Sequence, residues 1–225
     1  MIKRIPKQEL IRAAFHGMAM AEKKFSKMTS NTLHFCQAPE YLLTVNVAET
    51  LNKSAPNHLT WLEFQLSQAR SAARGHQPAL EQHMSRGRCD ILMCWASSKE
   101  PRAAFEIKRD VQTLSTVKTD VERILYLLNG GVDGNTLQFG AVMFSTMAES
   151  IHGRQVIKNR VEQFQKKLDG WRTTMGAHNR RLNIVCGDIK KRRAGDYWAP
   201  MAVIAERERK NGPNHDWSAS TMSFG

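Results

Sequence analysis

Two acidic residues and a lysine interrupt short apolar segments of the sequence. Asp90 lies within residues 88–95, and Glu106 and Lys108 end a second apolar segment at residues 103–108. Side chains alternate between the two faces of a β-strand, so Glu106 and Lys108 would point to the face opposite the apolar residues of their segment. If the two segments form adjacent strands, two carboxylates and an ammonium group converge.

This combination of groups suits one kind of chemistry. A carboxylate buried among apolar residues is costly unless it is paired or binds a metal ion. Mg²⁺, for which Mn²⁺ could substitute, takes one or two protein carboxylates together with waters and substrate phosphate oxygens. Asp90 and Glu106 would be the metal ligands, and Lys108 would orient water and offset charge on the phosphoryl oxygens. The three residues predict a magnesium-dependent site for hydrolysis of a phosphodiester.

With Asp90, Glu106 and Lys108 in this order and fifteen residues between the acids, the chain resembles the PD-(D/E)xK nuclease superfamily. Many restriction enzymes, Holliday-junction resolvases and repair nucleases belong to that superfamily. The proline that precedes the first acid there is Cys89 here. The resemblance implies cleavage that leaves 5′-phosphate and 3′-hydroxyl ends. It also implies a core of helix, three strands, helix and strand, with the acids on the second and third strands.

Apolar patterns along the chain agree with this order of elements. We expect helices over residues 39–51, 116–128 and 157–168, and strands over residues 58–66, 137–147, 182–186 and 198–204. Alternating helices and strands of this kind predict an α/β fold, specifically a restriction-endonuclease-like α/β sandwich with a central mixed sheet flanked by helices.

The resemblance also implies an acid on the first core helix. Glu49 lies between Leu42 and Val45 on the expected helix surface, so we predict that it points inward or into a cleft. There it would be a third catalytic acid and an outer metal ligand. Glu63, on the expected first strand, is the competing candidate.

The charge of the chain points to a polyanionic partner. The formal net charge is +12, and residues 154–193 contain twelve Lys and Arg but only three acids. We predict that the run Lys190, Lys191, Arg192 and Arg193 binds nucleic-acid phosphates, although a solvated basic loop is the alternative. Arg88 would either meet a phosphate or pair with an acid.

The regions outside the expected core are peripheral. Residues 1–37 would form a helical annex, with a helix over residues 6–25 that could also serve as a homodimer surface. Residues 38–208 would be the nuclease core and residues 209–225 a polar tail. No apolar stretch reaches the roughly 20 residues of a membrane span, and the first residues do not form a secretory signal, so we expect a cytoplasmic protein.

Simpler interpretations stand beside the site. Asp90 could cap a turn, Glu106 and Lys108 could form a solvated strand face, and Asp120 with Arg123 is expected to be an i,i+3 ion pair. The predicted function is a metal-dependent nuclease acting on nucleic acid, more specifically DNA. The alternatives are a non-catalytic nucleic-acid-binding protein with a PD-(D/E)xK-like fold and a basic scaffold protein.

Overall fold

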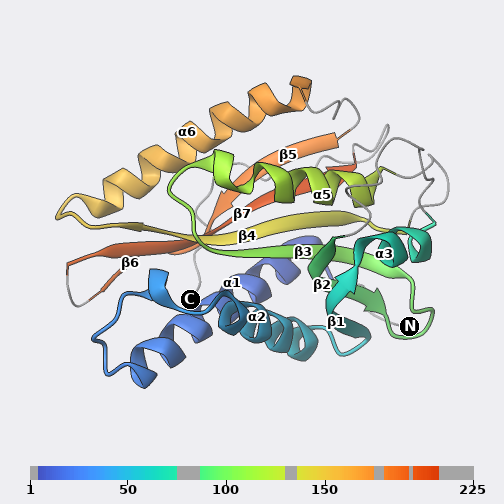
Figure 1. The fold of residues 1–225 in the computed structure, drawn as a ribbon, viewed down its shortest axis with the longest axis horizontal. Coiled ribbons are helices and arrows are strands. Elements are labelled where there is room, and N and C mark those ends of the chain that lie inside the picture. The colour runs from blue at the N-terminus through green and yellow to red at the C-terminus, as the bar shows by residue number, and fades with distance from the viewer. Residues whose placement is uncertain (1–4, 75–86, 130–135, 175–179, 193–194, 208–225) are drawn as a thin grey trace.

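A mixed seven-stranded sheet forms the centre of the computed structural model (Figure 1), which describes residues 5–74, 87–129, 136–174, 180–192 and 195–207. The strands are β1 (His58–Gln65), β2 (Arg88–Trp95), β3 (Pro101–Asp110), β4 (Phe139–Ala148), β5 (Arg180–Cys186), β6 (Lys190–Lys191) and β7 (Tyr197–Arg207). Their order is β1-β2-β3-β4-β7-β5, with β6 beside β7. The β3–β4 pair is parallel and the other described pairs are antiparallel, so the sheet is mixed, as predicted.

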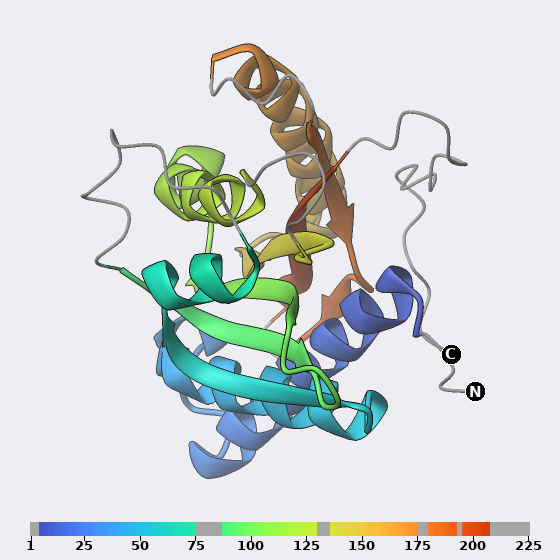
Figure 2. The same ribbon diagram turned by 90° about the vertical axis from the view of Figure 1, so that its right-hand side faces the viewer.

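Helices cover both faces of this sheet (Figure 2). They are α1 (Lys7–Met28), α2 (Glu40–Ser54), α3 (Leu66–Ala72), α5 (Lys118–Leu128) and α6 (Gly153–Thr174), with short 3-10 turns η1 (Phe35–Gln37) and η2 (Leu114–Val117). The apolar residues of α1 and α2 form one buried cluster with one face of the sheet, and those of α3, α5 and α6 form a second cluster with the other face. The α/β architecture with a sheet flanked by helices is therefore confirmed.

Strand β3 contributes to both layers. Phe105 and Ile107 belong to the cluster under α1 and α2, whereas Ala104 belongs to the cluster under α5. Because strand side chains alternate, Glu106 lies on the α5 face, where it is 1% exposed. The predicted alternation is confirmed, and it buries a carboxylate in the sheet.

The first helix is part of the core. Leu10, Phe15 and Met18 of α1 are at most 1% exposed and belong to the same cluster as α2 and the sheet. Gly17 permits close packing, because a Cβ there would lie 2.6 Å from the Cα of Val47 on α2. The core therefore extends across the boundary expected at residue 37. The polar tail predicted at residues 209–225 lies outside the described residues.

Most expected elements occur with shifted ends. The helix expected from residue 39 begins at Glu40, directly after Pro39, and the expected strand at residues 58–66 is β1. The short helix α3, which begins at Leu66, was not expected. None of the described helices is long and apolar enough to cross a membrane.

Candidate active site

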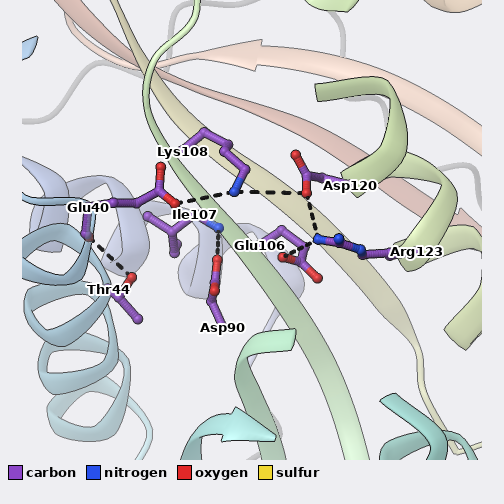
Figure 3. Close-up of polar contacts among 8 residues, drawn as sticks. All are labelled: Glu40, Thr44, Asp90, Glu106, Ile107, Lys108, Asp120 and Arg123. Atoms are coloured by element: carbon purple, nitrogen blue, oxygen red, sulfur yellow. Dashed lines mark hydrogen bonds and ion pairs between the residues drawn. The ribbon is translucent and has the colours of Figure 1, made fainter. Parts of the chain in front are cut away.

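Asp90 lies where strands β2 and β3 stop pairing. Their backbone pairing ends at Ile91 opposite Phe105, one residue short of Asp90. Beyond that point the backbone N–H of Ile107 donates a hydrogen bond to Oδ2 of Asp90 at 2.6 Å (Figure 3). The carboxylate thus takes the place of a backbone acceptor and is fixed against β3, beside Glu106. This local opening of the sheet makes room for a side chain between two strands.

Glu106 is buried, and few neighbouring groups offset the cost of burying its carboxylate. Its Oε2 lies 4.0 Å from Nη1 of Arg123, while no hydrogen-bond partner of Oε1 is found among the described residues. Burial and then the carboxylates of Asp90 and Asp120 raise its pKa well above the ordinary value, against the opposing influence of Arg123 and Lys108. A buried carboxyl group that resists ionisation is one that a cation would stabilise.

The same physics acts on Asp90. The pKa of Asp90 is raised to about 6. Burial is the main cause, with smaller contributions from the charges of Glu63 and Glu40, while the hydrogen bond from Ile107 and the charge of Lys108 act in the opposite direction. Two carboxyl groups are therefore held side by side in surroundings that disfavour their negative charge. Strongly shifted pKa values of this kind are concentrated at functional sites, and structural ion-pair networks also produce them.

Lys108 connects the two helical layers at the end of β3. Its Nζ lies 3.2 Å from Oε1 of Glu40 on α2 and 3.9 Å from Oδ1 of Asp120 on α5 (Figure 3). Burial lowers its pKa, but the carboxylates of Asp120 and Glu40 more than offset this and raise the pKa above the ordinary lysine value. Lys108 is therefore a fixed ammonium, suited to stabilising negative charge rather than to accepting a proton.

The acid that α2 brings to this group is Glu40 and not Glu49. Glu49 is 46% exposed and pairs with Lys53 at 2.7 Å and Lys24 at 3.5 Å, so the prediction that it points inward is wrong. The wheel position was misleading because its apolar neighbours Leu42 and Val45 are themselves only half-buried, at the margin of the packed face. Glu40, as the first residue of α2, lies at the helix end that faces β3.

Glu63 occupies an intermediate position. It is exposed on β1 and has a left-handed backbone conformation with φ 51°. Its negative charge contributes to the raised pKa of Asp90, so the two carboxylates are close enough to interact. No ion pair or hydrogen bond joins Glu63 to Lys108 or Glu106 in the described part of the chain.

Helix α5 supplies two residues that the sequence did not assign to the site. Arg123 and Asp120 form the expected i,i+3 ion pair at 3.0 Å, which is confirmed. The same two residues also approach Glu106 and Lys108, and Asp120 is only 5% exposed. An acid placed beside the apolar residues Val121 and Ile124 was the available signal that this side of α5 faces the sheet.

A magnesium ion suits part of this arrangement. Within the described ranges, no three His, Cys, Asp or Glu residues gather into a group that could hold a metal ion. Asp90 and Glu106 nevertheless offer two adjacent carboxylates, and Oε1 of Glu106 is a buried acceptor without a partner. Mg²⁺ needs only one or two protein carboxylates when water and phosphate complete its shell, so the donor set is suitable in kind and number.

The predicted phosphate-binding residues lie apart from the acids. Arg88 is exposed at the start of β2, and no ion pair with Asp90 or Glu106 is found among the described residues. Lys190 and Lys191 are exposed on β6. Arg192 is paired with Glu22 of α1 at 3.2 Å, and Arg193 lies outside the described residues.

Comparisons with known proteins do not assign the chain to a family. No family model matches it, and neither a curated protein nor a solved structure gives a significant match. Membership of the PD-(D/E)xK nucleases stays a prediction, based on Asp90, Glu106, Lys108 and the order of the elements that carry them.

Proposed function

We propose that the chain is a metal-dependent nuclease that hydrolyses phosphodiester bonds of nucleic acid, with DNA as the expected substrate. The observation that carries the proposal is the pair formed by the half-buried Asp90 and the buried Glu106 beside the ammonium of Lys108. Two like charges buried together destabilise a fold, so their juxtaposition needs a counter-ion or a chemical role. The net charge of +12 supports a polyanionic substrate.

Asp90 and Glu106 would hold Mg²⁺, or Mn²⁺ in its place. When bound, the ion would polarise a phosphoryl oxygen and lower the pKa of water for attack on phosphorus. The hydrogen bond from the Ile107 N–H fixes one Asp90 oxygen at 2.6 Å and leaves the other oxygen for a ligand. The unpartnered Oε1 of Glu106 is a second available acceptor.

Lys108 would stabilise the charge that grows on the phosphoryl oxygens. Its ammonium is held by Glu40 and Asp120, so its position does not depend on the substrate. A preorganised cation of this kind acts on the transition state more than on the ground state. Asp120 holds Arg123 in place, and the positive charge of Arg123 partly offsets the negative charge of Glu106.

One observation favours a second candidate, a non-catalytic nucleic-acid-binding protein with the same fold. Lys108 and Arg123 lie close to three acids, so the chain's own cations partly neutralise the cluster without a metal ion. In that case the basic residues would matter for binding, and Asp90 and Glu106 would be structural.

A cleavage assay separates the two candidates. Linear, nicked, branched and single-stranded DNA and RNA should be incubated with the purified protein in Mg²⁺, in Mn²⁺ and with a chelator. The nuclease predicts metal-dependent products with 5′-phosphate ends, which disappear in Glu106→Gln and persist in Glu49→Gln. Binding without cleavage by the wild type across the whole panel would favour the second candidate.

A further inference from the structure

A groove between α1 and the β6–β7 hairpin gathers basic residues from distant parts of the chain. It has a volume of about 570 Å³ and is lined by the C-terminal part of α1, by residues 31–34, and by β6 and its neighbours. Figure 1 shows β6 on the same side of the molecule as the C-terminal end of α1. Lysines 190 and 191 thus meet Lys23 and Lys27, which the sequence alone did not associate with them.

Of the two acids in the groove, Glu22 has a permanently charged partner, and Asp196 faces an imidazole. Glu22 accepts Arg192 at 3.2 Å, and Asp196 lies 3.1 Å from Nδ1 of His34. For Lys23, Lys27, Lys190 and Lys191, no ion pair with a carboxylate is found within the described part of the chain. The groove therefore presents four exposed ammonium groups, and their charge exceeds that of the carboxylate of Asp196, so positive charge is left for a ligand.

We infer that this groove, which we call the β6 groove, binds the phosphodiester backbone of a nucleic-acid duplex alongside the candidate active site. The inference rests on the proposed function for the nature of the substrate. Ammonium groups spread over two elements match a row of phosphates better than a single small anion. Phosphate contacts of this kind position a duplex without reading its bases.

The walls of the β6 groove favour a duplex over a single strand. Single-stranded nucleic acids are bound through exposed aromatic rings on which bases stack. The indole of Trp198 is 1% exposed and has Nζ of Lys190 5.8 Å from its ring centre, so it forms the floor of the groove. Among the lining residues that the structure describes, the imidazole of His34 is the only other aromatic ring.

The register of the sheet relates the groove to the acids. Lys108 lies opposite Phe144 on β4, while Lys190 is aligned through Trp198 with Met147, three residues further along the same strand. Three strand spacings and three residues place the backbone of Lys190, at the edge of the groove, roughly 15–20 Å from that of Lys108 along the sheet, a length of about five base pairs of duplex. A duplex that spans both regions would thus be contacted on one side of the cleaved bond.

The test is equilibrium binding of duplexes of about 20 base pairs in the presence of a chelator, so that cleavage plays no part. The variants are Lys23→Ser with Lys27→Ser and Lys190→Ser with Lys191→Ser. Arg192 is kept because it joins β6 to α1 through Glu22 and Ser26. The matched control is Lys166→Ser with Lys167→Ser on α6, where Lys167 likewise lies 6.0 Å from the ring centre of Trp171.

Each groove variant should weaken binding to duplex by about tenfold and lower the slope of log affinity against log salt by about two, while the α6 control changes both much less. Binding of duplex DNA and duplex RNA is compared to determine which of the two nucleic acids the β6 groove prefers. An equal effect of the α6 control, tighter binding of a single strand than of the duplex, or strong competition by a mononucleotide would overturn the inference.

Failure of the β6 groove and failure of the nuclease assignment are distinguishable. If both groove variants bind duplex as tightly as the wild type and metal-dependent cleavage is observed, the inference about the β6 groove is wrong and the proposed nuclease activity stands. If the groove variants weaken duplex binding but no cleavage is observed, the inference about the β6 groove stands and the proposed nuclease activity is wrong. Absence of duplex binding by the wild-type protein at low salt would overturn the groove directly.

Discussion

The candidate active site and the β6 groove carry charge in opposite ways. In the site, Glu106 is 1% exposed, Asp90 is half-buried, and burial raises the pKa of both carboxyl groups. In the groove, Lys190 and Lys191 are exposed and cost the fold little. Buried like charges must be offset by something else, whereas exposed ammonium groups need no compensation. The site is therefore the stronger indicator of chemistry, and the groove mainly indicates affinity.

The largest effect should come from the acids. If the proposed function holds, Asp90→Asn and Glu106→Gln should each lower the rate of cleavage by at least about a thousandfold, or about 4 kcal/mol, because each removes a proposed metal ligand without changing volume. Circular dichroism should show an unchanged fold. The control is Glu49→Gln on α2, whose carboxylate pairs with exposed lysines. A wild-type cleavage rate in either variant would contradict the claim that the chemistry depends on Asp90 and Glu106.

Loss of Lys108 should come next. Lys108→Ala should lower the cleavage rate by about a hundred- to a thousandfold while metal affinity stays within a few-fold of wild type, because an ammonium is needed mostly in the transition state. Single-turnover kinetics at saturating DNA measures this. Lys53→Ala, which removes the partner of exposed Glu49, is the control. A Lys108 variant that lost duplex affinity instead of turnover would place it with the β6 groove.

The pH dependence of stability should show the cost of burying the acids of the candidate active site. The folded-state pKa of Asp90 is about 6, above the ordinary 3.8, so the folded protein binds more protons than the unfolded chain between these values. The metal-free protein should therefore lose stability as the pH rises from about 4 through 6, by about 1 to 3 kcal/mol. Asp90→Asn should flatten this part of the profile in chemical denaturation. An equally steep profile in the variant would contradict the burial of its charge.

The smallest effect concerns the third acid. Glu40→Gln should lower activity by about tenfold or less, since Glu40 acts through Lys108 and is itself 41% exposed. Glu49→Gln should remain near wild type. Rates measured across a Mg²⁺ series compare the two variants of the same helix. The reverse order of effects would restore Glu49 as the outer ligand.

Sequence patterns predicted those parts of the molecule that depend on local periodicity. The alternation of Phe105, Glu106 and Ile107 was sufficient to place Glu106 opposite the apolar face of β3, and Pro39 correctly marked the start of α2. Both features follow from backbone geometry within a few residues. The α/β architecture followed from the same patterns.

Contacts between elements could not be obtained in this way. Glu40 and Glu49 lie on one helix, and which of them meets Lys108 depends on how α2 is placed against the end of β3. The meeting of Lys23 with Lys190 likewise depends on the packing of α1 against the sheet. A helix wheel gives the direction of a side chain relative to its own axis, but not its neighbours.

Calorimetric titration of Mg²⁺ and Mn²⁺ into the substrate-free protein tests the central claim most directly, because it does not depend on finding the preferred substrate. We predict saturable binding to wild type and Glu49→Gln and its loss in Asp90→Asn and Glu106→Gln. Near pH 6 the heat should also vary with the buffer, because the ion displaces protons from carboxyl groups whose pKa is raised. Absence of binding by wild type, or equal binding by wild type and both site variants, would contradict a metal site at Asp90 and Glu106.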